Sequence, residues 1–233
     1  MESVPGAIAT GLLWGKSLRP WIETRSLSLP VLTSVSDQLM TSNLIIGLRA
    51  RTGRAIAVVI GGSRTAPLVV SKTEIKLTDP KIPETFQPYH EVMDLPWEQS
   101  QRAVRTFTRP IEVVARKALA KMIKELEGKG LKVKGVSVVG SKDRDLARIG
   151  NYHIRAHAAE GILFRRVLER AAEAYGLLTR TFPDRELEPM ATSELGLSPV
   201  EIKQTLSNLG QSLDPPWRAD EKQAALAAWL MLK

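Results

Sequence analysis

The densest group of chemically active side chains lies between Gly140 and Glu160. His153, His157 and Glu160 follow one another at intervals of four and three residues, so a helix would place all three on one face. Such a face could supply metal ligands or a general acid and base. The structural alternative is that His157 and Glu160 hydrogen-bond the helix to the preceding loop. The sequence shows no further ligand beside them, so we predict no metal site and take His157 and Glu160 as candidate catalytic residues.

Two groups of polar and basic side chains could bind an anion such as phosphate. One group surrounds the end of an expected strand near residue 48, and the other follows an expected strand that ends near residue 139. If these strands are parallel neighbours, the two groups meet at one edge of a sheet, where ligands commonly bind. The structural alternative is a solvated basic loop. The candidate phosphate-binding residues are Arg49, Arg51, Arg54, Ser141, Lys142, Arg144 and Arg148.

The chain as a whole is basic, with 33 Lys and Arg residues, 25 Asp and Glu residues and a formal charge of +8. Residues 101–170 concentrate this charge, since they hold 17 basic and 7 acidic side chains. Such a concentration predicts contact with the phosphate backbone of nucleic acid, and we expect DNA rather than RNA. Aromatic residues make up only 5% of the chain, so stacking on single-stranded bases is not indicated.

The chain contains no cysteine, which excludes disulfides, thiolate metal sites and a cysteine nucleophile. No apolar run reaches the roughly 20 residues needed to cross a bilayer. The short apolar stretch 7–14 is not preceded by the basic residues of a signal peptide. We therefore expect a cytoplasmic protein without membrane contact. The sequence leaves open whether the protein forms a homo-oligomer.

The elements that must position these side chains follow from the hydrophobic pattern. Three apolar runs separated by short turns predict an antiparallel meander of strands at 44–48, 55–60 and 67–77. The later pattern predicts helices at 97–127, 155–175, 198–209 and 220–232, with strands at 131–139 and 177–182. A strand that follows a helix should run parallel to its neighbour. The predicted fold class is therefore α/β, a mixed sheet in which the meander precedes alternating helices and parallel strands, with helices on both faces.

The first 39 residues differ from the rest of the chain. They carry no net charge, and Pro5, Pro20 and Pro30 interrupt any long element. A strand pattern begins shortly after Met40. We therefore expect a domain at 40–233, and residues 1–39 are either an N-terminal arm packed on it or a segment that precedes the natural start at Met40.

Three short stretches, taken with the order of the elements, resemble a known superfamily. They are the strand 44–49, the helical stretch Ala156-His-Ala-Ala-Glu-Gly161, and the stretch 202–206 followed by Asp220–Ala228. The superfamily is the ribonuclease H-like one, and the resemblance within it is to the RuvC-type Holliday-junction resolvases. It implies two-metal phosphodiester hydrolysis, in which carboxylates of the first strand, the central parallel strand and the last helix hold two Mg²⁺ ions.

The sequence departs from that pattern at two of its three carboxylate positions. Arg49 stands where the first-strand aspartate should follow Gly47-Leu48, and no acid lies at 137–139. On the last helix, Asp220 can match a family carboxylate, although with Gln223 it could instead cap that helix. A cation at Arg49 would repel Mg²⁺. The departures therefore predict a degenerate acidic site without the ordinary nuclease activity.

The leading hypothesis is a ribonuclease H-like protein that binds nucleic acid through a basic surface. Any remaining catalysis would rest on Asp220, Glu160 and His157. One alternative is a metal-dependent, structure-specific endonuclease with relocated carboxylates, for which Mg²⁺ would be the cofactor and Asp143, Asp145, Glu160 and Asp220 the acids. The other is a protein-interaction or regulatory module that retains only the fold. Whether the protein is an enzyme stays open among these hypotheses.

Overall fold

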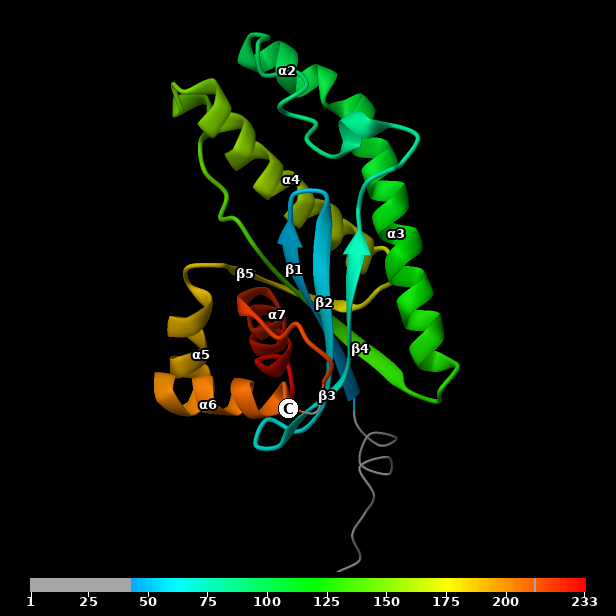
Figure 1. Cartoon of the computed structure of the whole chain (residues 1–233), viewed down its shortest axis with the longest axis vertical. Coiled ribbons are helices and arrows are strands. Elements are labelled where there is room, and N and C mark those ends of the chain that lie inside the picture. Colours follow the sequence, from blue (N-terminus) through cyan, green and yellow to red (C-terminus); the bar gives the residue numbers. More distant parts are fainter. Residues whose placement is uncertain (1–42, 212) are drawn as a thin grey trace, which may run out of the picture. The chain divides into compact units, whose positions relative to one another are not determined.

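The computed structural model describes residues 43–211 and 213–233, so the expected arm and the boundary at Met40 lie outside the described residues. The strands are β1 (Asn43–Arg51), β2 (Arg54–Gly62), β3 (Pro67–Lys76), β4 (Lys132–Gly140) and β5 (Leu178–Pro183) (Figure 1). The helices are α2 (Trp97–Ala103), α3 (Arg105–Glu127), α4 (Tyr152–Glu173), α5 (Leu187–Leu195), α6 (Pro199–Leu209) and α7 (Ala219–Trp229). Two short 3₁₀-helices, η1 (Pro83–Thr85) and η2 (Leu146–Arg148), lie in the connections.

The five strands form one mixed sheet in the order β3-β2-β1-β4-β5. β1 pairs antiparallel with β2, and β2 with β3, because the turns between them are short. β4 and β5 each follow a long helix and run parallel to β1 and to each other. This topology confirms the predicted α/β class, a mixed sheet in which the antiparallel meander precedes alternating helices and parallel strands.

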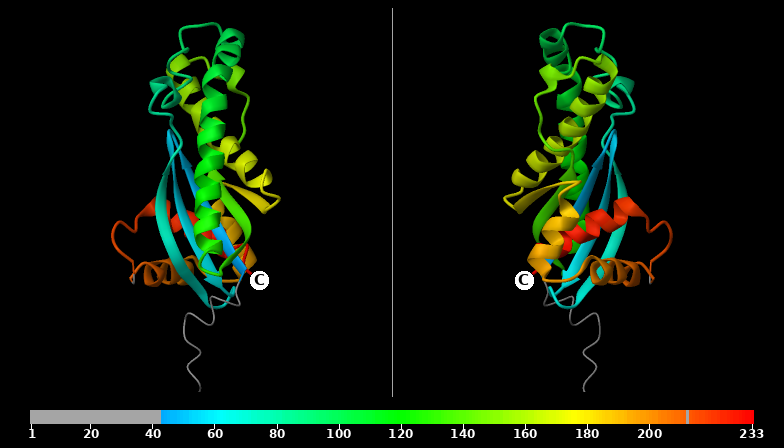
Figure 2. Two further views of the ribbon diagram at one scale, coloured as in Figure 1. Left: turned by 90° about the vertical axis from the view of Figure 1, so that its right-hand side faces the viewer. Right: turned by 90° about the vertical axis from the view of Figure 1, so that its left-hand side faces the viewer.

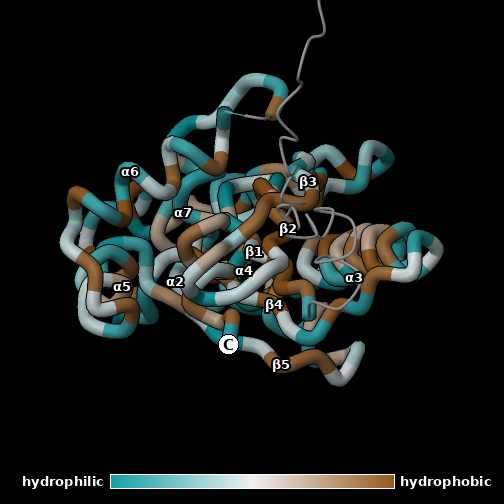
Figure 3. Tube along the Cα trace, turned by 90° about the horizontal axis from the view of Figure 1, so that it is seen from below, coloured by the Kyte–Doolittle hydropathy of each residue, from teal (hydrophilic) through white to brown (hydrophobic). Residues whose placement is uncertain are grey.

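Helices cover both faces of the sheet (Figure 2). Successive side chains of a strand point to opposite faces. Leu44, Ile46 and Leu48 of β1 accordingly join the core that α3 and α4 form on one face. Ile45 joins the second core, on the face covered by α5, α6 and α7. In Figure 3 hydrophobic stretches follow the strands, whereas hydrophobic and hydrophilic positions alternate in the helices around them.

The structure differs from the predicted elements in two places. The expected helix 97–127 is interrupted at Val104, whereas Pro110 lies inside α3 without ending it. α5 was not predicted, because it is only 9 residues long and has little amphipathic character. The helix expected from residue 198 is confirmed as α6. Ser198 caps it, since its Oγ accepts from the Glu201 backbone N–H at 3.3 Å and its own backbone N–H donates to Glu201 Oε2 at 2.8 Å. No helix in the described part of the chain is long and apolar enough to span a membrane.

Gly161 lets α4 approach the end of β4. A Cβ atom at this position would lie 2.5 Å from Ser141 Oγ and 3.3 Å from Ser141 Cβ. We expect Gly161→Leu to lower the free energy of unfolding by about 1–3 kcal/mol through overpacking. Gly161→Ala should be nearly neutral, because the serine hydroxyl can rotate away and alanine favours a helix by about 1 kcal/mol over glycine. Urea unfolding would measure both, and a leucine variant as stable as wild type would show that this helix face is not packed.

Candidate active site

The close packing of α7 on β1 places the first candidate site. Residues 45, 47 and 49 of β1 face α7, while residues 220, 224 and 228 recur once per turn of α7. A Cβ on Gly47 would lie 1.9 Å from the Ala224 carbonyl oxygen, so only glycine lets the helix backbone lie on the strand. One turn before Ala224, Asp220 comes level with Arg49.

The Arg49 side chain is buried between two carboxylates, and the residue is only 4% exposed. Its Nη2 lies 3.4 Å from Asp184 Oδ2, and its Nε lies 3.7 Å from Asp220 Oδ1. Nη1 also donates to the Val139 carbonyl oxygen of β4 at 3.4 Å. The guanidinium therefore joins β1, β4, the end of β5 and the start of α7.

A second guanidinium completes this network. Arg51 donates from Nε to the Asp220 carboxylate at 3.0 and 3.1 Å and from Nη2 at 2.5 Å. These hydrogen bonds lower the pKa of the Asp220 carboxyl and raise that of Arg51. Burial and the neighbouring Arg51 lower the pKa of Arg49, while Asp184 and Asp220 act in the opposite direction. The pKa of Asp220 is therefore lower in the folded than in the unfolded protein. Its ionised carboxylate stabilises the folded state at pH values above the pKa of the unfolded protein. This stabilisation is lost as the pH falls through the pKa of the folded protein.

This arrangement does not fit the two Mg²⁺ ions that the resemblance implies. The cluster already contains a cation, since the Arg49 guanidinium lies between Asp184 and Asp220. On the central parallel strand, Ser137 is fully buried, pairs with Gly47 and offers a hydroxyl rather than a carboxylate. Two carboxylates neutralised by arginines do not hold a pair of hard dications.

The proposed capping role of Asp220 was wrong. Arg218 is the residue that precedes α7, and its backbone N–H donates to Glu221 Oε2 at 2.8 Å. Glu221 thus supplies the carboxylate of the helix start. The side chain of Asp220 is directed instead to Arg51 and Arg49 across the strand.

The two groups of basic residues were predicted to meet at one edge of the sheet, and the strand ends that carry them do lie next to each other. Arg49 pairs with Val139 in the parallel register of β1 and β4, so the ends of the strands lie side by side. Ser141 contacts Gly161, and Arg144 is exposed. Most of the charged candidates are engaged by acids, in the pairs Arg51–Asp220, Arg54–Glu74, Lys142–Glu186 and Arg148–Asp145. This edge is a network of ion pairs, and phosphate binding by its residues stays a prediction.

The relocated carboxylates do not assemble into a metal site. Asp143 pairs with Arg165 and Arg166, and Asp145 accepts a hydrogen bond from the Ala147 backbone. Glu160 belongs to α4. Asp220 belongs to the group that it forms with Arg49, Arg51 and Asp184, which we call the arginine cluster. Within residues 43–211 and 213–233, the one group of three acidic or histidine side chains at metal-binding distance consists of histidines.

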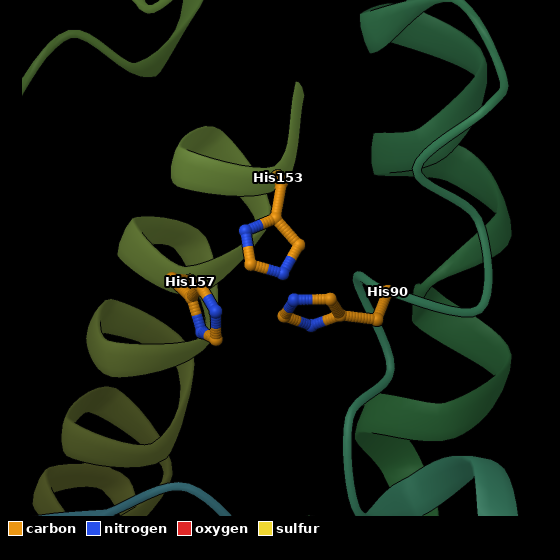
Figure 4. Close-up of side chains that lie close together, drawn as sticks. All are labelled: His90, His153 and His157. Atoms are coloured by element: carbon orange, nitrogen blue, oxygen red, sulfur yellow. The ribbon is translucent and has the colours of Figure 1, made fainter. Parts of the chain in front are cut away.

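The histidine cluster combines His153 and His157, from the predicted face of α4, with His90, which the sequence did not suggest. His153 and His157 lie on one side of α4, and His90 approaches them from the segment between η1 and α2 (Figure 4). Glu160 is fully buried, and its Oε1 lies 2.8 Å from His90 Nδ1. Glu160 therefore anchors α4 to the segment of His90 rather than to the loop that precedes the helix. The three candidate catalytic residues are divided between two clusters.

Sequence reasoning missed Asp184 and His90. Asp184 follows β5 directly, at the same edge of the sheet as Arg49. The expectation that polar residues at the ends of neighbouring parallel strands meet could therefore have identified it. His90 lies in an aperiodic, proline-rich segment 70 residues from Glu160. Nothing in the local pattern connects it to α4.

Comparisons with known proteins extend this description. No protein-family model matches the sequence, and no curated protein matches it significantly. RuvC from Thermus thermophilus has a similar structure with a TM-score of 0.43 and 10% identity, covering 80% of this chain and 92% of RuvC. Thermus thermophilus RuvC in complex with a Holliday junction substrate also gives a TM-score of 0.43 and 10% identity, covering 81% and 91% of the two chains. The fold class itself rests on the strand order and the helix layers of this chain.

Proposed function

We propose that this protein binds nucleic acid through a basic surface of its ribonuclease H-like domain and does not hydrolyse phosphodiesters by the ordinary two-metal route. The observation that carries the second part is the buried guanidinium of Arg49 between Asp184 and Asp220. It lies at the strand end where the resemblance implies a metal-binding aspartate. The positive charge between these two carboxylates is therefore supplied by the Arg49 side chain.

The surface of α3 supports the first part of the proposal. One face of this helix packs on the sheet through Ile111, Ala115 and Leu119, which are buried. Its other side exposes basic residues that make no ion pair with any residue in the described part of the chain, namely Arg105, Arg109, Arg116, Lys117 and Lys124. The 23 residues of α3 extend over about 34 Å, close to one turn of a DNA duplex. Cations along such a length suit contacts with successive phosphates of a backbone.

The basic surface continues beyond the end of α3. Lys129, Lys132 and Lys134 are exposed in the turn and at the start of β4. Lys132 lowers the pKa of Lys134, because the two ammonium groups repel each other. A polyanion would relieve this repulsion, which makes the end of α3 and the start of β4 a favourable place for phosphates.

Binding should be tested with junction, duplex and single-stranded DNA probes over a range of salt concentrations, with and without Mg²⁺. We expect salt-dependent binding without cleavage. The double variant Arg109→Gln, Arg116→Gln should weaken binding to all double-stranded probes. The slope of log K against log salt should become shallower by about two, one for each lost phosphate contact.

The matched control removes two positive charges from the other face of the sheet. Lys203 lies on α6 and Lys222 on α7, so Lys203→Gln, Lys222→Gln changes the net charge equally without touching α3. We expect this variant to keep the wild-type salt slope. Equal losses in the two double variants would contradict an α3 surface, and Mg²⁺-dependent cleavage by the wild type would contradict a non-hydrolytic role. Absence of binding to every probe would favour the protein-interaction hypothesis.

A further inference from the structure

We propose that His90, His153 and His157 bind one Zn²⁺ ion, with Glu160 orienting His90. The three rings approach one another closely, with centroid separations of 5.1 Å for His90 and His153 and 4.4 Å for each of the other two pairs. One ligand nitrogen from each ring lies within 4.8 Å of the other two. Figure 4 shows the rings of α4 directed toward that of His90.

Binding one ion needs only a small adjustment of this cluster. Nitrogens that share a tetrahedral Zn²⁺ at about 2.1 Å lie about 3.4 Å apart. His153 and His157 are exposed at the start of α4, so their side chains have room to rotate toward His90. Their spacing of four residues already places them one turn apart on one helix face.

Glu160 gives the strongest indication of a ligand. It is fully buried, and His90 is the partner of its only ion pair among the described residues. Its carboxylate accepts from His90 Nδ1 at 2.8 Å and from the His90 backbone N–H at 3.3 Å. A buried carboxylate is costly without compensation, and a hydrogen bond from a metal-bound histidine is a common way to provide it.

This hydrogen bond also decides which nitrogen of His90 is free. A carboxylate only accepts hydrogen bonds, so the proton of the neutral imidazole lies on Nδ1 and Nε2 presents a lone pair. His90 Nε2 is buried and has no hydrogen-bond partner in the described structure. A carboxylate on one ring nitrogen and an unpartnered second nitrogen facing two more histidines is the arrangement of a histidine ligand with its orienting acid.

The chemistry of the donors selects the ion. Three imidazoles suit Zn²⁺ and related transition metals and do not suit Mg²⁺ or Ca²⁺, which prefer oxygen ligands. Three protein ligands leave a fourth position for water or an anion. The ion would tie the segment between η1 and α2 to α4, two parts of the chain that meet only through tertiary packing. The site is separate from the arginine cluster and does not depend on nucleic-acid binding.

Composition makes the test direct, because the chain has 3 histidines and no cysteine. Tag-free full-length protein should be titrated with Zn²⁺ by calorimetry and with Co²⁺ by visible absorption, which reports tetrahedral nitrogen coordination. We expect one ion per chain and a higher Tm in the presence of Zn²⁺. His153→Ala and His157→Ala should each lower the affinity by more than about 100-fold, since each removes one of three metal bonds.

Two further variants distinguish a specific metal site from adventitious metal binding. Glu160→Gln keeps all three ligands and should lower the affinity about 10- to 100-fold while leaving one ion per chain. Glu173→Gln, an exposed change of the same type on α4, should leave the affinity unchanged. Because His153 and His157 are exposed, their variants should fold, which unfolding in the presence of a chelator would verify. Failure of the wild type to bind Zn²⁺, or binding that survives loss of both exposed histidines, would overturn the proposal.

Discussion

Replacing Gly47 with alanine is expected to destabilise the domain by about 3 kcal/mol or more, at the upper end of overpacking effects. The new Cβ would lie 1.9 Å from the Ala224 carbonyl oxygen, 2.7 Å from its carbonyl carbon and 3.1 Å from Ala228 Cβ. Neither a backbone carbonyl nor an alanine side chain can rotate away, so α7 as a whole would have to move off β1. Denaturant unfolding would measure the loss.

Moving α7 away from β1 should also disrupt the ion pairs of the arginine cluster. Asp220 precedes Ala224 by one turn, so moving α7 separates it from Arg49 and Arg51. Gly150→Ala is the matched control, because a Cβ there meets no atom within 4 Å. We expect that control to stay within about 0.5 kcal/mol of wild type. A Gly47→Ala variant as stable as the control would mean that α7 does not rest on β1.

Changing Arg49 to aspartate should lower the free energy of unfolding by about 3–5 kcal/mol in the absence of divalent cations, the range for removing one partner of a buried ion pair. Asp184 and Asp220 would lose the cation between them and face a third carboxylate. Three clustered carboxylates are ligands for Mg²⁺. We therefore expect millimolar Mg²⁺ to restore part of the stability of this variant and to leave the wild type unchanged.

Arg49→Met is the matched control, since it removes the guanidinium without adding a carboxylate. It should be destabilised without a response to Mg²⁺. Neither variant should cleave DNA, because Ser137 leaves the central strand without an acid. A wild-type protein that gains as much stability from Mg²⁺ as Arg49→Asp would show that the native cluster accepts the ion. Cleavage by Arg49→Asp would show that Asp184 and Asp220 suffice beside the restored acid.

Much of the fold could be predicted from local pattern. The apolar runs of β1, β2 and β3 and the turns between them determine the meander, because side-chain alternation and turn residues act over short distances. The periods of α3 and α4 and the capping box at Ser198 are equally local. The interruption at Val104 and the short helix α5 could not be predicted, because no strong period or cap marks them.

The candidate sites depend on both levels. The sequence by itself determined that His153, His157 and Glu160 share a helix face and that Arg49 ends the first strand, since these follow from helical and strand periods. Only the tertiary structure decided what they meet. Arg49 contacts Asp184 over 135 residues, and His90 meets Glu160 over 70. The first contact depends on how closely α7 packs on β1, which Gly47 makes possible. The second depends on the path of an aperiodic segment, and no local period specifies that path.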